Sequence, residues 1–139
     1  EDLAAYLAAK YGEPIQRAEI EDADTLYFLA ERDGALIGYC MVGRLDLPVE
    51  DDNAVELHRL YLRAEAKGAG VGPALMERAL AWARGRNARA MYLSVWENNH
   101  RAQRFYRRYG FVDHSEWDFM VGRVADRDLI WKRALANGE

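Results

Sequence analysis

Hydrophobic and polar residues alternate in two neighbouring segments near the start of the chain. Residues 25–31 and 35–44 place apolar side chains at about every second position, which is typical of strands with one buried face. The Asp33-Gly34 pair between them favours a tight turn, because both residues adopt a positive φ readily. We therefore predict an antiparallel hairpin. Before it, four apolar residues share one side of a predicted helix: Leu3, Tyr6, Leu7 and Tyr11.

A third alternating segment, residues 56–62, leads into a glycine-rich loop at residues 67–72, Lys-Gly-Ala-Gly-Val-Gly, and then into a helical pattern. After the loop, Leu75, Ala79 and Trp82 fall on one helical face. This order predicts a strand, a loop and a helix. Period-two geometry gives the strand two faces, the first with Glu56, His58, Leu60 and Leu62 and the second with Leu57, Arg59 and Tyr61.

The same order of strand and helix recurs over residues 91–111. Met91, Leu93 and Val95 share one face of the predicted strand, and Asn99 stands where a helix N-cap is expected. A glycine at position 110 ends the helix. The helix carries one apolar stripe, formed by Ala102, Phe105, Tyr106 and Tyr109. Residues 111–135 then predict two strands around a loop at residues 122–127.

Alternating strands and helices over 139 residues predict a single α/β (α+β) domain, and half of the residues are apolar, enough for a core. A net charge of -4 disfavours a nucleic-acid partner and suits a cationic substrate. The single cysteine, Cys40, excludes an intrachain disulfide, and we expect it to be a buried thiol. The longest apolar run, residues 35–43, is too short to cross a membrane, and we expect a cytoplasmic protein with no membrane partner.

The glycine-rich loop has the composition of a phosphate-binding turn. Glycines let the backbone approach a ligand, and the following helix adds unpaired amides and the positive end of its dipole. The spacing fits neither the P-loop nor the Rossmann fingerprint. Pro73, in the first turn of the helix, cannot donate an N–H, so a phosphate must rely on the residues before it.

Two motifs in this order resemble the GNAT superfamily of acetyl-CoA-dependent N-acetyltransferases. Lys67, Gly70 and Gly72 match the marked positions of its Arg/Gln-x-x-Gly-x-Gly/Ala pyrophosphate motif. The second motif of the family matches at Asn99, Ala102, Tyr106, Gly110 and Phe111. Within the superfamily, the chain resembles the PaiA-type polyamine acetyltransferases at Trp96-Glu97-x-Asn99, Phe119-x-x-Gly122 and Asp128-x-Ile130, although Trp131 stands where that branch usually has Met.

The resemblance implies the GNAT fold, a central mixed and mostly antiparallel twisted sheet flanked by helices. A splayed strand pair in that fold holds coenzyme A, with the pantetheine arm on strand amides. The family has a strand and a helix before the point where residue 1 falls, so we expect residues 1–139 to be one domain that lacks them. The coenzyme-binding residues that the resemblance implies are Leu60, Tyr61, Leu62, Lys67, Gly68, Ala69, Gly70, Val71, Gly72, Asn99 and Tyr106.

The resemblance also assigns catalytic roles. By pattern alone Tyr106 is a core aromatic, but its motif position implies the acid that protonates the leaving thiolate. Glu56 falls where many GNAT enzymes place the base that deprotonates the amine, and His58 is its rival. For Glu56 the alternative is a solvated carboxylate at a strand end. We expect direct attack of the amine on the thioester, with an amide near Leu60 polarising the carbonyl.

Other chemistry has little support in the sequence. Ser94 and Ser115 lie outside any Gly-x-Ser-x-Gly elbow. The three histidines, His58, His100 and His114, lack metal-ligand spacing with Cys40 or with each other, so we expect no metal.

The acetyl acceptor is the least constrained part of the prediction. A polyamine-like primary amine is favoured, with a protein N-terminus or lysine, or a non-catalytic acyl-CoA-binding module, as alternatives. Residues 50–52, Glu-Asp-Asp, either help to attract the amine or are simply solvated. Charged residues 123 and 126–128 could contact it too. Dimers are common in the superfamily, which makes a homodimer one option.

Overall fold

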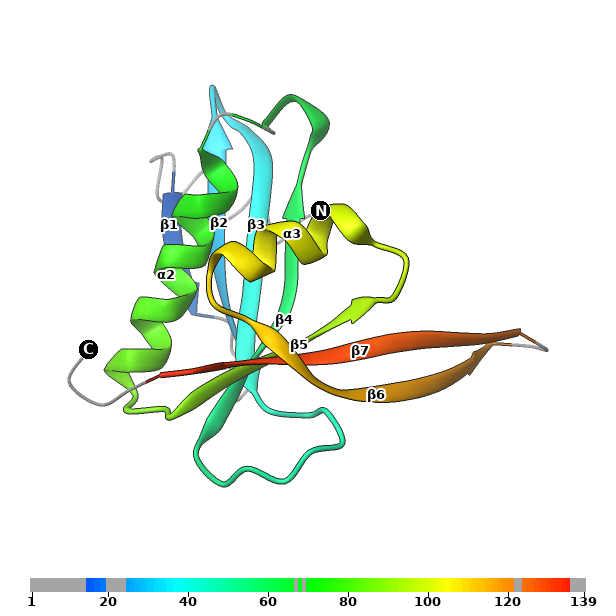
Figure 1. Cartoon of the computed structure of the whole chain (residues 1–139). Coiled ribbons are helices and arrows are strands. Elements are labelled where there is room, and N and C mark those ends of the chain that lie inside the picture. Colours follow the sequence, from blue (N-terminus) through cyan, green and yellow to red (C-terminus); the bar gives the residue numbers. More distant parts are fainter. Residues whose placement is uncertain (1–14, 20–24, 67, 69, 122–123, 136–139) are drawn as a thin grey trace. The chain divides into compact units, whose positions relative to one another are not determined.

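The computed structural model describes residues 15–19, 25–66, 68, 70–121 and 124–135 (Figure 1). The helix predicted at residues 3–11 lies outside these residues. In chain order, the elements are β1 (Ile15–Glu19), β2 (Thr25–Arg32), β3 (Ala35–Arg44), β4 (Ala54–Leu62), a 3-10 turn (Ala64–Ala66), α2 (Val71–Gly85), β5 (Ala90–Trp96), α3 (His100–Arg108), β6 (Val112–Val121) and β7 (Val124–Ala134).

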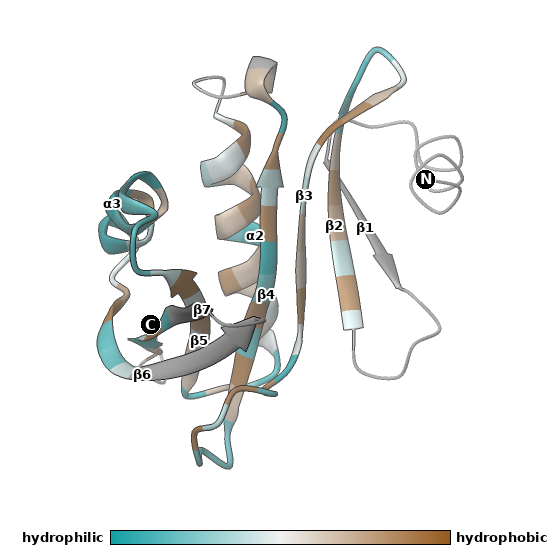
Figure 2. Ribbon diagram, turned by 90° about the vertical axis from the view of Figure 1, so that its right-hand side faces the viewer, coloured by the Kyte–Doolittle hydropathy of each residue, from teal (hydrophilic) through white to brown (hydrophobic). Residues whose placement is uncertain are grey.

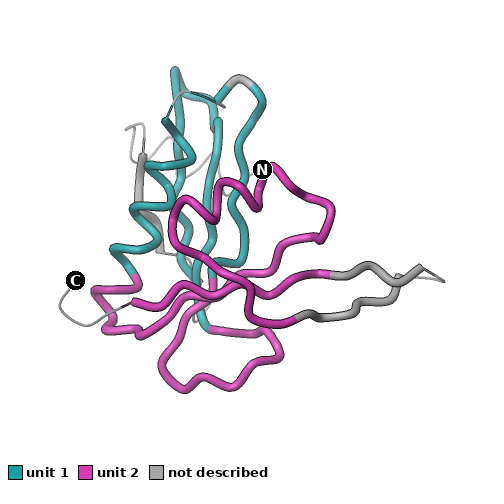
Figure 3. Tube along the Cα trace, in the orientation of Figure 1, with its two compact units in different colours: residues 1–44, 57–82 teal, residues 45–56, 83–139 magenta. Residues whose placement is uncertain are grey.

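The chain divides into two compact units (Figure 3). Unit 1 comprises residues 1–44 and 57–82, and unit 2 comprises residues 45–56 and 83–139. Strand β4 contributes to both units, because its first three residues belong to unit 2 and the remainder to unit 1.

Unit 1 is built on an antiparallel meander in the order β1-β2-β3. The predicted hairpin turn is confirmed, since Asp33 and Gly34 have φ angles of 55° and 81°. Helix α2 packs on this sheet, where Cys40 Sγ lies 3.7 Å from the Leu75 carbonyl oxygen. Burial raises the pKa of the Cys40 thiol to about 12, which confirms the predicted buried thiol.

Unit 2 has the strand order β4-β5-β7-β6. Strand β5 pairs in parallel with the start of β4 and antiparallel with β7, which pairs antiparallel with β6. One core cluster on this sheet joins Leu47, from the loop before β4, to Ala90, Tyr92 and Ile130. The predicted fold class, a mixed and mostly antiparallel sheet with helices, is confirmed.

The predicted loop at residues 122–127 is wrong in its length. Strand β7 begins at Val124, and Asp126 and Arg127 pair with Phe119 and Asp118 of β6. The charged residues had indicated a loop, but an antiparallel ladder satisfies backbone N–H and C=O groups whatever the side chains are. Gly122 and Arg123, which connect the strands, lie outside the described residues.

Candidate functional site

Glu56 is a buried carboxylate in the last residue pair of the parallel ladder between β4 and β5. The ladder runs from Ala54↔Ala90 to Glu56↔Tyr92, although both strands continue beyond it. Only 6% of Glu56 is exposed, and its Oε1 accepts the Asp46 N–H at 2.8 Å. A buried carboxylate needs such donors, because its charge has lost water. The solvated strand-end interpretation of Glu56 is therefore wrong.

His58 follows in the same strand and is half-buried. Its Nε2 lies 2.9 Å from the Arg44 carbonyl oxygen. Because a carbonyl only accepts, Nε2 must carry the proton in this contact, which leaves Nδ1 as the basic nitrogen of the neutral ring. The Nε2 atom is therefore committed to the backbone.

Residues 54–62 all belong to strand β4, but burial alternates along only part of it. From His58 to Leu62, half-buried and exposed residues alternate, with Arg59 and Tyr61 exposed. At the start of the strand Val55, Glu56 and Leu57 are all buried. The alternation fails there because both faces of the strand are covered, so burial does not place Glu56 on the face of Leu60 and Leu62.

The strand end that carries Leu60, Tyr61 and Leu62 lies close against β3. A Cβ atom at Gly38 would come within 2.9 Å of both the Tyr61 carbonyl oxygen and Leu62 Cδ2. The Tyr61 side chain is 48% exposed, and its ring centroid is 5.6 Å from that of Tyr39. Glycine at position 38 thus lets this end of β4 approach its neighbour.

The glycine-rich loop has the backbone that its sequence predicts. Gly68 and Gly70 both have a φ of +83°, which residues with a Cβ rarely adopt. Helix α2 then begins at Val71, and the Ala74 N–H donates to the Gly70 carbonyl at 3.1 Å. Because Pro73 has no N–H, the first-turn amides of Val71 and Gly72 remain for an anion. Lys67 and Ala69 lie outside the described residues.

Helix α3 begins at an N-cap, as predicted. The Asn99 side chain accepts the Ala102 N–H at 3.1 Å. The sequence analysis did not single out Gln103, which is buried and donates to the carbonyls of Trp96 and Glu97 at 3.1 and 3.0 Å. These bonds hold the turn before α3. The one indication in the sequence was that Gln103 lies beside the apolar stripe of the helix, next to Ala102 and Tyr106.

Tyr106 lies half-buried on the same helix. Its ring centroid is 5.6 Å from that of Phe105 and 5.9 Å from that of Phe111. The predicted aromatic packing is confirmed, but Tyr106 is not a fully buried core residue. The residue as a whole stays partly accessible, which is compatible with a proton donor.

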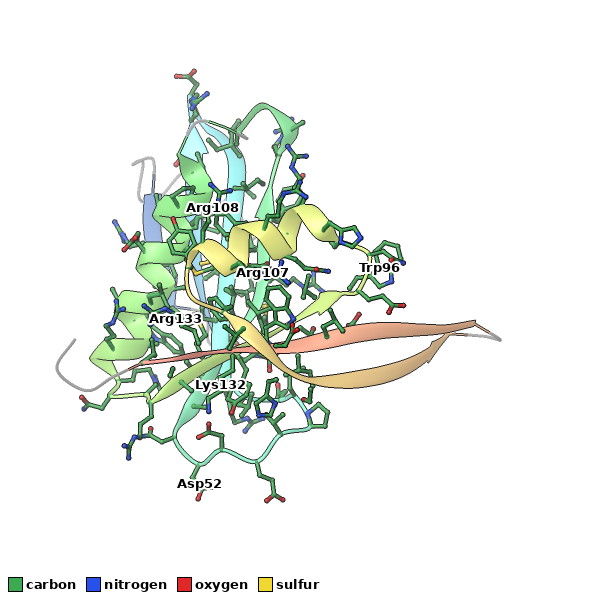
Figure 4. The ribbon with its side chains drawn as sticks, in the orientation of Figure 1. Asp52, Trp96, Arg107, Arg108, Lys132 and Arg133 are labelled. Carbon is green, nitrogen blue, oxygen red and sulfur yellow. The ribbon has the colours of Figure 1, made fainter. Side chains whose placement is uncertain are left out.

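Arginines make the outer surface of α3 strongly basic, and Figure 2 shows the helix mostly in the hydrophilic colour. Four of them are exposed: Arg101, Arg104, Arg107 and Arg108. Figure 4 labels Arg107 and Arg108 here, together with Lys132 and Arg133 of β7. The Arg107 guanidinium lies 4.9 Å from the ring centroid of Trp131. Trp131, which departs from the PaiA-type pattern, is therefore a buried platform for an arginine.

Tyr92 and Asp51 form a contact that the sequence did not predict. The Tyr92 hydroxyl donates to Asp51 Oδ2 at 2.9 Å. Burial and the neighbouring Asp51 carboxylate raise the pKa of Tyr92 to about 12, so the phenol keeps its proton. Both residues belong to unit 2, as does Glu56. In the sequence, Tyr92 carries a polar hydroxyl in a largely apolar strand and Asp51 is one of three consecutive acidic residues. Neither feature identifies the other residue as its partner.

A model of the family described as "Acetyltransferase (GNAT) family" matches residues 2–111 of the chain, which is more than half of its length. The chain belongs to the GNAT acetyltransferase family. The acyltransferase prediction, with acetyl-CoA as the cosubstrate of the family reaction, is confirmed at this level. Among the described residues of this GNAT enzyme, no three His, Cys, Asp or Glu side chains gather as metal ligands.

Two curated relatives extend the GNAT match. The "Uncharacterized N-acetyltransferase in pepI 3'region" of Lactobacillus delbrueckii subsp. lactis is 31% identical over 137 residues, covering 97% of this chain and 79% of that protein. The "Spermine/spermidine N(1)-acetyltransferase" of Bacillus subtilis (strain 168) is 31% identical over 100 residues, covering 70% and 66% of the two chains.

A solved structure shows the same GNAT fold. The PaiA N-acetyltransferase from Thermoplasma acidophilum, crystallised in complex with coenzyme A, has a TM-score of 0.65 and 22% identity. The superposition covers 96% of this chain and 69% of that one. No described helix of this GNAT enzyme has the length and apolar character needed to span a bilayer.

Proposed function

We propose that this chain acetylates a polyamine-like primary amine by direct transfer from acetyl-CoA in a ternary complex. The observation that carries the proposal is the buried carboxylate of Glu56, held by the Asp46 amide at 2.8 Å in a chain of this family. Carboxylate side chains are rarely buried in proteins, and those that are buried and hydrogen-bonded are concentrated at functional sites.

The coenzyme is held by the loop of residues 67–72 and by the end of β4. Support comes from the positive φ angles of Gly68 and Gly70 and from the first-turn amides of Val71 and Gly72, which suit a diphosphate. Lys67 adds a positive charge, Ala69 completes the loop, and Asn99 adds a polar contact besides capping α3. Backbone groups of Leu60, Tyr61 and Leu62 bind the pantetheine arm.

Glu56 begins the reaction by taking a proton from the acceptor ammonium, directly or through water. The neutral amine nitrogen then forms a bond to the thioester carbonyl carbon, and a backbone N–H near Leu60 stabilises the oxyanion. The carbon–sulfur bond breaks, and Tyr106 gives its hydroxyl proton to the departing thiolate. The attacking nitrogen, which became positively charged when it formed the new bond, loses its second proton to the Tyr106 phenolate, directly or through water, and Glu56 returns its proton to solvent. His58 is the rival base and would act through Nδ1, because its Nε2 carries the proton that binds the Arg44 carbonyl.

The choice of a small polyamine rests on two further observations. The relative named as a spermine/spermidine acetyltransferase is 31% identical over 100 residues, and the net charge of -4 favours approach of a cation. The reaction is placed in the cytoplasm, where a free thiol such as Cys40 stays reduced.

A panel of acceptors tests the proposal. The purified chain is mixed with acetyl-CoA and one acceptor at a time: spermine, spermidine, a simple monoamine, or a peptide that carries a lysine or a free N-terminus. Turnover is followed as release of the free thiol of coenzyme A. We expect turnover with the polyamines. Glu56→Gln keeps an acceptor for the Asp46 amide but should lower kcat by about 10²–10⁴-fold. Turnover with peptides alone contradicts the polyamine assignment, and coenzyme binding without any turnover supports a non-catalytic module instead.

A further inference from the structure

Four hydrogen bonds fix the loop of residues 45–53, which connects β3 to β4. At its start the Asp46 N–H donates to Glu56 Oε1 at 2.8 Å. At its end the Asn53 side chain donates to the Asn87 carbonyl at 3.1 Å, and the Asn53 carbonyl accepts the Arg89 N–H at 2.8 Å. The fourth, in the middle of the loop, is the hydrogen bond from the Tyr92 hydroxyl to Asp51. The first of these contacts involves the side chain that we assign as the base.

The Asp51 carboxylate uses both of its oxygens. Oδ1 accepts the Asn53 N–H at 3.3 Å, which shapes the turn, and Oδ2 accepts the Tyr92 hydroxyl at 2.9 Å, which attaches the turn to β5. Because the pKa of Tyr92 is raised to about 12, its hydroxyl stays a donor throughout the working pH range of enzymes. A hydrogen bond with a charged acceptor is stronger than a neutral one. Asp51 therefore binds the loop firmly to the sheet.

Tyr92 contacts this loop twice. Its ring packs in the buried cluster with Leu47, the residue after Asp46, and its hydroxyl binds Asp51 four residues later. In the β4–β5 ladder, the residue opposite Tyr92 is Glu56 itself. Tyr92 thus adjoins the base in the sheet and restrains the loop that supplies a hydrogen-bond donor to the base.

We propose that Tyr92 and Asp51 are positioning residues, which hold the 45–53 loop so that the Asp46 amide fixes the Glu56 carboxylate for proton transfer. This inference rests on the proposed role of Glu56. A purely structural role for the pair would lower stability but leave kcat and the Asp46 contact unchanged in the folded enzyme.

Tyr92→Phe is the decisive variant, since it removes only the hydroxyl. The ring keeps its place in the cluster with Leu47. Its centroid also stays 5.3 Å from the centroid of the His114 ring and 5.7 Å from Lys132 Nζ. We expect kcat with the best amine to fall about tenfold, because a small misplacement of a catalytic group is costly, while KM for acetyl-CoA stays unchanged. Hydrogen exchange of the Asp46 amide, followed by NMR, should accelerate by about the same factor.

The control is Tyr39→Phe in unit 1, where the ring packs against Leu29 and lies beside the rings of Tyr27 and Tyr61. It should leave kcat and the Asp46 exchange rate unchanged. Asp51→Asn should retain most of the activity, because its amide can donate to the Tyr92 hydroxyl while its oxygen accepts from Asn53. Asp51→Ala, which also removes the acceptor for the Asn53 N–H, should lower kcat at least as much as Tyr92→Phe, and the double variant should lose no more than Asp51→Ala alone.

The outcomes separate this inference from the proposed function. Loss of turnover in Glu56→Gln together with unchanged kcat in folded Tyr92→Phe overturns the positioning role and leaves the base in place. Additive losses in the double variant, or a fall in kcat without faster exchange at Asp46, also overturn it. Full turnover in Glu56→Gln removes the proposed base, and the positioning role is then overturned with it.

Discussion

Gly38 lies so close to Leu62 that a Cβ atom at position 38 would be 2.9 Å from Leu62 Cδ2 and equally near the Tyr61 carbonyl oxygen. The carbonyl belongs to a backbone that cannot move without disturbing β4. We expect Gly38→Ala to lower the free energy of unfolding by about 1–3 kcal/mol, as overpacking does. Denaturant titration measures this change. Gly85→Ala is the matched control, because nothing lies within 4 Å of its added Cβ; an equal loss there would contradict the steric explanation.

Gly70 and Gly34 provide a matched pair for the coenzyme loop. Their φ angles are +83° and +81°, and neither has a neighbour within 4 Å of an added Cβ. Alanine should strain both turns similarly, by about 1–2 kcal/mol. Only Gly70→Ala should also weaken acetyl-CoA binding, by roughly tenfold, because the proposed diphosphate site includes its loop and not the turn at Gly34. Calorimetric titration compares the two variants, and equal affinities would count against the loop as the phosphate site.

Asn99 has two assigned roles that substitutions can separate. Asn99→Ala removes the acceptor for the Ala102 amide and should lower the free energy of unfolding by about 1 kcal/mol. Asn99→Asp retains the cap and should keep the stability. If Asn99 also contacts the coenzyme, the added negative charge should raise the Kd for acetyl-CoA. Unchanged affinity in the stable Asp variant would restrict Asn99 to capping.

Tyr106→Phe tests the acid. The variant keeps the ring that packs beside Phe105 and Phe111 and removes the proton donor. We expect kcat to fall by about 10²-fold or more while the Kd for acetyl-CoA is retained. Tyr109→Phe, on the next turn of the helix segment, should leave kcat unchanged. Full activity in Tyr106→Phe would mean that this ring only packs.

The Cys40 thiol should not react with thiol reagents while the enzyme is folded. Its thiol is fully buried with a pKa of about 12, against 9.0 in the unfolded chain, so a thiol reagent at pH 8 should label it only as fast as the protein opens. The folded state holds the proton more tightly than the unfolded state does. Cys40 therefore stabilises the fold fully below about pH 9, and this contribution is lost as pH rises towards 12. Rapid labelling under native conditions would contradict the burial.

Local patterns predicted much of the fold. The turn at Asp33-Gly34, the Asn99 cap and the glycine loop each follow from the conformational preferences of one or two residues, and all are observed. Period two also predicted β2 and β3 of unit 1, but no strand was predicted at residues 15–19, where β1 lies. It failed at the start of β4, because burial on both faces removes the alternation.

The contacts that matter most for Glu56 could not be predicted in this way. Asp46 and Glu56 are ten residues apart, and Asp51 and Tyr92 are 41 residues apart. Such pairs depend on how a loop folds back over a sheet, and neither propensity nor spacing encodes that path. The same limitation applied to the β6–β7 hairpin, where charged residues indicated a loop but backbone pairing with β6 extended the strand.

Arg133 Nε donates to the Tyr109 carbonyl at 2.7 Å, so the helix that carries Tyr106 ends against a side chain from the last strand. The helix begins against its own Asn99. A fragment that stops before residue 133 would leave that carbonyl without this donor and loosen the turn next to Tyr106. A variant shortened in this way could lose activity because Tyr106 is displaced, although every proposed catalytic residue is present. Activity assays should therefore use a chain that retains Arg133.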